Sequence, residues 1–357
     1  MTRPHVIFHL GQDKTGSTAI QRALLRCDAD LQAAGVLFPD PGKHANHQIL
    51  MPMLSGRLPD DPVQMQTLAR SPEAAWAAAK SSWHRVTTAL AGGTVQRVII
   101  SSEIEFRAWS PEDIAHVTQT LRQISDRIEI VAYLRSPASY LMSVVQQDLK
   151  KRPNFRPISA SRYRDALEPF LNSGLGEMRV LAFDRKTLIG GDVVMDFCTR
   201  FVPEVAADHI TAQAEHDNET LSAEAVSLLQ GYFRKEVHAP HRWYDARPQR
   251  FKRLVMAADA AVAGYCKPQL KPGLAEMACA RANDLDWLAE TFGVDFRGDT
   301  GGISKSDAEA RFNSLRDIED ITCVDGDRRA AMLAEMQRTA QQDQSPRARL
   351  QRLFGRK

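Results

Sequence analysis

The stretch HLGQDKTGST, residues 9–18, decides how the chain begins to fold. Two glycines, Gly11 and Gly16, are separated by four residues, which is the glycine spacing of a phosphate-binding loop. The preceding residues 6–10 form an apolar run with one histidine, and this pattern predicts a buried parallel strand. Over residues 17–34 apolar side chains recur with helical spacing. The sequence therefore predicts a strand, a glycine loop and the start of a helix.

The position of the lysine separates this loop from that of a nucleotide triphosphatase, which places lysine directly after the second glycine. Here Ser17 and Thr18 follow that glycine, and Lys14 comes two residues before it. Backbone N–H groups and the positive end of the helix dipole converge at such a turn and bind phosphate-like oxyanions. From the loop, Lys14 can reach charge that develops on a bridging oxygen during group transfer. The plainer alternative is a glycine turn that binds no ligand.

Four further apolar runs predict more strands of the same sheet. They are residues 36–39, 97–103, 128–135 and 177–184. Helical patterns separate them, and two of these, 71–90 and 110–124, open with Ser-Pro-Glu, a strong helix start. Strands that alternate with helices need crossover connections. The predicted fold class is therefore α/β, a P-loop-like parallel sheet flanked by helices on both faces, with a mostly helical C-terminal part.

Strand patterns fade after about residue 205, and this divides the chain into three parts. Residues 1–205 are predicted to form the core that carries the glycine loop. Residues 206–344 form a helical part of the same domain and are the candidate for an acceptor pocket, together with the loop 39–72. Residues 345–357 form a basic tail.

Composition limits the kind of protein. The 357 residues are 43% hydrophobic and 25% charged with a formal net charge of +2, so no strong charge favours nucleic acid as a partner. No apolar run reaches the roughly 18 residues of a membrane-spanning helix. The five cysteines form no CxxC pair and no metal-binding pattern with histidine. This predicts reduced thiols, a cytoplasmic location and no metal, and nothing in the sequence indicates the oligomeric state.

A second candidate anion site follows the strand 128–135. Arg135 ends that strand, and Ser143 comes eight residues later, about two turns into the next predicted helix. The carboxyl ends of parallel strands meet at one edge of the sheet, where open α/β sheets bind ligands. Arg135 and Ser143 could hold one phosphate between them. The alternatives are a surface salt bridge for the arginine and a bond to the helix backbone for the serine.

Together these two motifs carry a resemblance to a known family. KTGST (14–18), followed by YLRSPASYLMS (133–143), resembles the two cofactor motifs of sulfotransferases that use PAPS, 3′-phosphoadenosine 5′-phosphosulfate. The resemblance covers about the first 185 residues. Two departures are Asp13, where many members have proline, and the lack of a late Arg-Lys-Gly triplet, for which the segment 296–306 is a candidate replacement.

The resemblance implies specific roles for these residues. The loop would bind the 5′-phosphosulfate, with Lys14 at the oxygen that bridges to the leaving sulfuryl group. The other loop residues implied in this binding are Thr15, Gly16, Ser17 and Thr18. Arg135 and Ser143 would bind the 3′-phosphate. GVLFP, SSE and LAFDRKTL also resemble segments of bacterial members that act on carbohydrates and related acceptors.

Sulfuryl transfer also needs a base that accepts the acceptor's proton. Glu103 follows a strand at the ligand-binding edge, and a glutamate is the base in members that resemble the heparan-type enzymes. The alternative for Glu103 is to favour a helix start, because Ser102 and Glu105 match a capping box. His47 is the rival base, with His44 beside it, because histidine titrates near neutral pH.

The function predicted from sequence is a PAPS-dependent sulfotransferase that transfers a sulfuryl group to a hydroxyl or amine of a carbohydrate or small-molecule acceptor. Two alternatives stay open. One is a P-loop nucleotide kinase or triphosphatase, and the other is a non-catalytic nucleotide-binding protein of the same fold. The identity of the acceptor cannot be read from the sequence.

Overall fold

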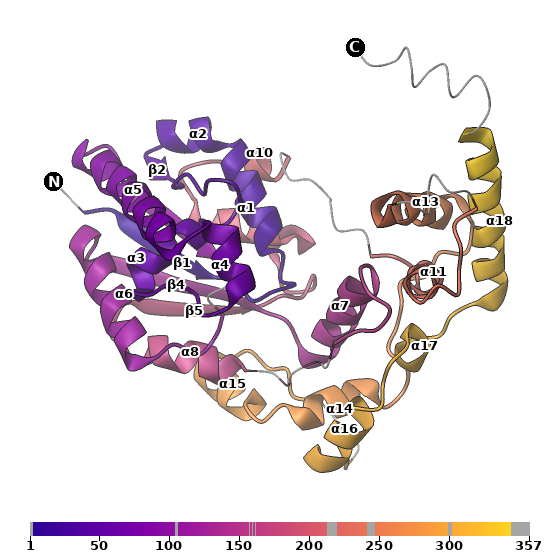
Figure 1. The fold of residues 1–357 in the computed structure, drawn as a ribbon. Coiled ribbons are helices and arrows are strands. Elements are labelled where there is room, and N and C mark those ends of the chain that lie inside the picture. Colours follow the sequence, from indigo (N-terminus) through magenta and orange to yellow (C-terminus); the bar gives the residue numbers. More distant parts are fainter. Residues whose placement is uncertain are drawn as a thin grey trace. The chain divides into compact units, whose positions relative to one another are not determined.

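The computed structural model describes residues 3–103, 106–156, 158, 160, 162–212, 220–240, 247–298 and 302–343. The chain divides into two compact units, each built from three segments. Unit 1 comprises Met1–Ser136, Arg162–Asp217 and Asp284–Arg297, and unit 2 comprises Pro137–Ser161, Asn218–Asn283 and Gly298–Lys357. Figure 1 labels the elements of both units.

A five-stranded sheet forms the centre of unit 1. Its strands are β1 (His5–Leu10), β2 (Val36–Leu37), β3 (Arg97–Ser102), β4 (Arg127–Leu134) and β5 (Glu177–Ala182). They lie in the order β2-β3-β1-β4-β5, and every pairing is parallel. All six residues of β1 are buried, as expected for a central strand covered on both faces. The predicted α/β class with an all-parallel sheet is confirmed.

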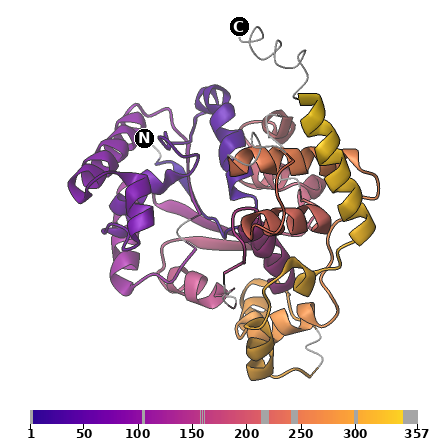
Figure 2. The ribbon, with the colours of Figure 1, turned by 45° about the vertical axis from the view of Figure 1, so that its right-hand side comes forward.

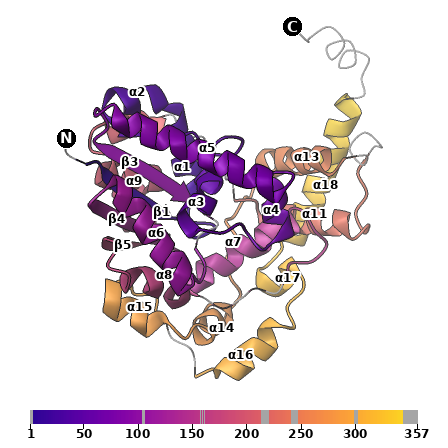
Figure 3. The same ribbon diagram turned by 60° about the vertical axis from the view of Figure 1, so that its left-hand side comes forward.

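Helices cover both faces of this sheet. Those of unit 1 are α1 (Ser17–Arg26), α2 (Asp28–Ala33), the 3₁₀ helix η1 (His47–Leu50), α3 (Met51–Ser55), α4 (Pro62–Leu68), α5 (Pro72–Ala91), α6 (Pro111–Ile124), α8 (Tyr163–Leu171), η2 (Ile189–Gly191), α9 (Val193–Phe201), α10 (Ala207–Ala212) and α15 (Leu285–Phe292). On one face, Ile7 of β1 shares a core with Leu24 of α1 and Phe197 of α9. On the other face, Phe8 packs against Phe170 of α8, with ring centroids 6.0 Å apart. Figure 3 shows α3, α5 and α6 toward the viewer.

Local sequence signals account for several helix boundaries. Ser71 and Ser110 cap α5 and α6, each accepting a backbone N–H bond three residues ahead, at 3.2 and 3.1 Å. The prediction of a single helix over 17–34 is wrong in one respect. The helix is interrupted at Cys27, which has a φ of −96° and a ψ of 16° and separates α1 from α2. The segment 39–72, predicted as mostly loop with room for one short helix, contains three short helices, η1, α3 and α4.

In the described part of unit 2, every element of regular secondary structure is a helix. Its helices are α7 (Pro137–Leu149), α11 (Ala223–Phe233), α13 (Pro248–Ala261), α14 (Leu274–Arg281), α16 (Lys305–Phe312), α17 (Ile318–Ile321) and α18 (Gly326–Asp343). In Figure 2 the yellow α18 lies beside α11 and α13, and apolar side chains of these helices form one core. Arg328 of α18 is buried there and binds Glu224 at 3.0 Å and Asp259 at 2.9 Å. The predicted helical C-terminal part thus has its own core.

The two units do not follow a single division at residue 205. Helix α7 belongs with the C-terminal helices of unit 2, whereas α15 returns to unit 1 and packs on α8. The predicted basic tail, 345–357, lies outside the described residues. Among the helices that the structure describes, none is long and apolar enough to cross a membrane.

Candidate functional site

The glycine loop lies where three strands of unit 1 end. β1 occupies the middle of the sheet between β3 and β4, so residues 11–16 emerge at the carboxyl edge, between the ends of those neighbours. The Gly11 N–H donates to the Ser102 carbonyl at 2.9 Å and extends the β1–β3 pairing into the loop. β3 lies on one side of β1 and β4 lies on the other, so the order of the strands changes direction at β1. Open α/β sheets bind ligands at the carboxyl ends of the strands at such a switch point.

The loop backbone adopts a conformation that few residues tolerate. Gly16, the residue before α1, has a φ of 79°, and a Cβ at this position would lie 2.7 Å from Val193 Cγ1. Lys14 has a φ of 67°, in the left-handed region that side chains other than glycine rarely adopt. Lys235 has a similar φ of 64°, so the strain by itself assigns no function. The loop holds Lys14 in place at an energetic cost.

The hydroxyl groups of the loop and of the first turn of α1 differ in how deeply they are buried. Thr15 Oγ1 donates to the Gln12 carbonyl at 2.6 Å, and Thr15 and Ser17 are both buried. Their hydroxyls lie 3.5 Å apart. Thr15 therefore stabilises the turn from inside, while Thr18 is half-buried in the first turn of α1. The ten residues of α1 direct a positive helix end at this position.

Arg135 reaches the loop from the end of β4. Its backbone N–H donates to Gln12 Oε1 at 2.8 Å, and its guanidinium donates to the Lys14 carbonyl at 2.7 Å. Its own carbonyl accepts from the Tyr163 hydroxyl at 2.5 Å. Burial lowers the pKa of Arg135, and the nearby Asp13 opposes that shift. The structure thus brings together Lys14 and Arg135, which are 121 residues apart in the sequence.

Glu103 lies against the same helix end. Thr18 Oγ1 donates to Glu103 Oε1 at 2.7 Å. A Cβ on Gly11 would come within 3.2 Å of Glu103 Cγ and 2.5 Å of Ser17 Oγ, so glycine at this position lets the carboxylate side chain approach the loop. The first helix described after β3 is α6, capped by Ser110, so Glu103 is not in its first turn. Glu105, the partner in the alternative capping box, lies outside the described residues.

His47 has a structural environment. Its Nδ1 accepts from the Ser101 N–H at 2.9 Å, and its Nε2 donates to the Pro39 carbonyl at 2.6 Å. The ring is fully buried, and burial lowers the pKa of His47 to about 4. Nδ1 therefore connects η1 to β3, and Nε2 connects η1 to the segment after β2. Because both nitrogens are engaged, this arrangement disfavours the rival assignment of His47 as base. His44, the neighbouring candidate, is exposed.

A buried, hydrogen-bonded polar group that includes His9 lies beneath the loop. Ser101 Oγ lies 2.9 Å from His9 Nδ1 and accepts from Gln21 Nε2 at 2.9 Å. Burial lowers the pKa of His9 to about 4, so the imidazole is neutral at pH 7. These contacts link β1, β3 and α1 directly behind the loop. The alternation of β3, which directs Ser101 toward α1, was the only signal that could have indicated them.

Ser143, the second predicted ligand of the 3′-phosphate, belongs to α7 and hence to unit 2. It is half-buried within that helix. The site described above, which includes Lys14, Thr18, Glu103 and Arg135, belongs entirely to unit 1. The role of Ser143 accordingly rests on the sequence motif.

A separate pocket of about 300 Å³ lies in unit 1. Phe38, Pro39 and Asp40 line it after β2, and Arg85 and Val86 of α5 line the other side. None of the predicted cofactor ligands lines this pocket. It does include the start of the segment 39–72, which the sequence suggested for the acceptor.

No family model matches this chain, and no curated protein matches it.

Proposed function

We propose that the chain is a PAPS-dependent sulfotransferase with a P-loop-like cofactor site in unit 1. The observation that carries the proposal is that Glu103 contacts Thr18 in the first turn of α1, while the Arg135 guanidinium contacts the adjoining loop at the Lys14 carbonyl, at the carboxyl edge of the sheet. Two cations and a helix N-terminus suit an oxyanion such as a phosphosulfate. The order and spacing of the two sequence motifs point to the same cofactor.

In the proposed reaction, an acceptor oxygen or nitrogen attacks the sulfur in line with the bridging oxygen. The new bond to sulfur forms as the sulfur–oxygen bond to the phosphate breaks, and adenosine 3′,5′-bisphosphate leaves. Glu103 takes the acceptor's proton. Lys14 and the N-terminus of α1 stabilise the negative charge on the leaving phosphate.

The contact between Thr18 and Glu103 implies that the cofactor binds before Glu103 can act as the base. In the described structure the Thr18 hydroxyl donates to the carboxylate. The resemblance assigns the same hydroxyl to the phosphosulfate, and one hydroxyl donates one hydrogen bond at a time. Binding of the cofactor would therefore turn Thr18 away and leave the Glu103 carboxylate available to the acceptor.

The 3′-phosphate is assigned to Arg135 and Ser143 from the sequence motif. We propose a carbohydrate or small metabolite as acceptor. We propose a cytoplasmic location from the scattered cysteines of the sequence.

One observation supports a second candidate, a nucleotide kinase or triphosphatase. A threonine hydroxyl and a carboxylate 2.7 Å apart at the start of the helix are oxygen ligands of the kind that Mg²⁺ prefers. Against it stands the lack of a lysine directly after Gly16. The two candidates differ in the ligand that they require.

Isothermal titration calorimetry distinguishes them. Adenosine 3′,5′-bisphosphate should bind at least tenfold more tightly than adenosine 5′-monophosphate, which is about 1.4 kcal/mol. Arg135→Ala should remove most of that preference, because charged hydrogen bonds contribute about 1.5–3 kcal/mol. Arg127→Ala is the matched control, since Arg127 is exposed at the opposite end of β4.

Equal affinity for the two nucleotides would refute the sulfotransferase proposal. Tight binding of ATP only with magnesium would favour the kinase or triphosphatase. Binding of the bisphosphate without any PAPS consumption across an acceptor panel would favour a non-catalytic nucleotide-binding protein.

A further inference from the structure

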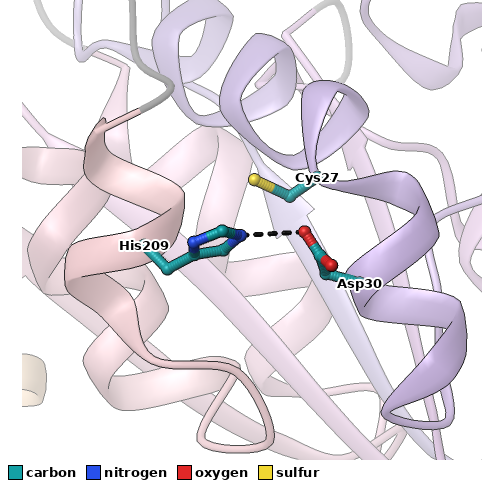
Figure 4. A group of neighbouring side chains, drawn as sticks. All are labelled: Cys27, Asp30 and His209. Atoms are coloured by element: carbon teal, nitrogen blue, oxygen red, sulfur yellow. Dashed lines mark hydrogen bonds and ion pairs between the residues drawn. The ribbon is translucent and has the colours of Figure 1, made fainter.

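Three side chains with metal-binding chemistry meet on the surface of unit 1, apart from the glycine loop. Cys27 Sγ, an Asp30 carboxylate oxygen and a His209 ring nitrogen all lie within 4.8 Å of one another. Figure 4 shows them directed toward a common point, with His209 Nε2 2.8 Å from Asp30 Oδ2. The cysteines and histidines show no metal-binding pattern in the sequence, and His209 is 179 residues from Asp30 along the chain.

The fold places these side chains from three elements. Cys27 is the non-helical residue between α1 and α2, and Asp30 follows three residues later, on the next turn. His209 lies on α10. Ile210, its neighbour on α10, is buried in the same apolar core as Cys27, and this packing holds α10 against the α1–α2 junction.

We propose that Cys27, Asp30 and His209 bind a zinc ion. Thiolate, imidazole and carboxylate are the three ligand types that proteins use for zinc, and three protein ligands leave a fourth position for water. Tetrahedral bonds of the usual lengths place ligand atoms about 3.5 Å apart. The three atoms lie within 4.8 Å of one another, and Asp30 and His209 are the exposed side chains that would move to reach that spacing.

Burial differs across the cluster in a way that suits an ion entering from solvent. Cys27 is 1% exposed, whereas the side chains of Asp30 and His209 are 57% and 51% exposed. The plainer interpretation is a surface ion pair beside a buried thiol. Such exposed pairs contribute little to stability, so little is lost when an ion replaces the contact.

The cluster places an exposed carboxylate beside a buried thiol, with their ligand atoms within 4.8 Å of each other. A bound divalent cation stabilises a thiolate and neutralises a carboxylate at the same time. This arrangement therefore suits a cation.

The proposed ion would join the α1–α2 junction to α10 and stabilise unit 1. It would not take part in sulfuryl transfer, because the ten residues of α1 place its far end about 15 Å from the loop. The proposal is therefore independent of the proposed function.

Cobalt titration tests the site directly. The chain is stripped with a chelator, and the exposed thiols are removed by Cys266→Ser and Cys323→Ser so that they bind no metal. Co²⁺ should bind with one equivalent per chain and give a thiolate-to-cobalt absorption band, and Zn²⁺ should displace it. Zn²⁺ should also raise the melting temperature.

His209→Ala and Asp30→Asn should each weaken binding at least about tenfold and remove most of the zinc-dependent shift in melting temperature. Cys27→Ser should abolish the absorption band. Both Asp30 and His209 are exposed, so their variants keep the test valid even if the buried cysteine variant folds poorly. His84→Ala, an exposed histidine on α5, is the matched control. Absence of the band in the parent chain, or unchanged binding in His209→Ala and Asp30→Asn, would overturn the proposal.

Discussion

Lys14 combines a strained backbone with a cationic side chain at the glycine loop. Its φ of 67° is a conformation that costs residues other than glycine roughly 1–2 kcal/mol. Glycine would satisfy the backbone without this cost. The effect of the backbone strain and the effect of the ammonium group can be measured separately at this position.

Lys14→Gly and Lys14→Ala form a matched pair for that measurement. Both remove the ammonium, but only glycine relieves the backbone, so Lys14→Gly should be about 1 kcal/mol more stable than Lys14→Ala. Both should lose turnover more than cofactor affinity, because the bridging oxygen gains charge mainly in the transition state. Chemical denaturation and consumption of radiolabelled PAPS report the two effects. A turnover rate that holds while cofactor binding weakens would make Lys14 an anchor.

Glu103→Gln tests the proposed base. Glutamine can still accept the Thr18 hydrogen bond but cannot take a proton. Stability and affinity for adenosine 3′,5′-bisphosphate should stay near those of the parent chain, while the transfer rate falls by about 10²–10⁴. A melting curve, a calorimetric titration and a rate measurement on one variant suffice. A near-normal rate would contradict the assignment and direct attention to His44.

At the level of residues, the sequence could predict the loop, Arg135 and Glu103 because each follows a strand that ends at the same edge. It could not predict that Gln12 receives the Arg135 N–H or that His47 supports Ser101. Those contacts depend on how loops far apart in sequence pack, and no periodic pattern encodes that packing.

At the level of elements, apolar runs and Ser-Pro helix starts identified all five strands and several helices, because local patterns determine them. The break at Cys27 was missed, since residues 17–34 keep one apolar face on both sides of it. η1, α3 and α4 were also missed, because short helices owe their stability to tertiary contacts more than to propensity.

The connection of η1 to β3 through His47 predicts a pH dependence of stability. His9 and His47 have pKa values of about 4 in the folded chain and about 6.5 when unfolded. Between pH 6.5 and pH 4 these histidines are protonated in the unfolded chain but neutral in the folded chain. The free energy of unfolding is therefore highest above pH 6.5 and decreases as the pH falls toward 4. Each histidine should account for about 2 kcal/mol between pH 6.5 and pH 5.

Urea denaturation at a series of pH values measures this slope, and His47→Gln should reduce it. His84→Gln, on the exposed surface of α5, controls for the loss of an imidazole in general. A slope that is the same in the parent chain and in His47→Gln would contradict a neutral, buried His47.

At the level of the whole molecule, the chain alternates between two units, and each unit collects three segments. The sequence signalled a change from strands to helices near residue 205. It could not signal that α7 and α15 belong with distant segments, because membership of a unit depends on long-range packing. Helix α15, for example, joins unit 1 through contacts such as the Arg164 N–H bond to Asp284 at 3.1 Å.

Because α15 belongs to unit 1, a core substitution in α15 should destabilise unit 1. Leu288 is fully buried, and Leu288→Ala should cost about 2–5 kcal/mol. Hydrogen exchange should show the loss of protection in α8 and the sheet of unit 1, although the substitution lies beyond residue 205. Leu254→Ala, in the core of unit 2, is the matched control and should affect α11 and α18. Loss of protection in unit 2 alone for Leu288→Ala would contradict the assignment of α15.

The late position of α15 also has a consequence for the newborn chain. The last strand of the sheet ends at Ala182, but the segment that completes unit 1 begins at Asp284. A ribosome that adds about 5–20 residues per second needs about 5–20 s to cover that interval. Throughout it, the surface of α8 that α15 will cover stays exposed on the nascent polypeptide. That surface is therefore where we expect a chaperone to bind during translation.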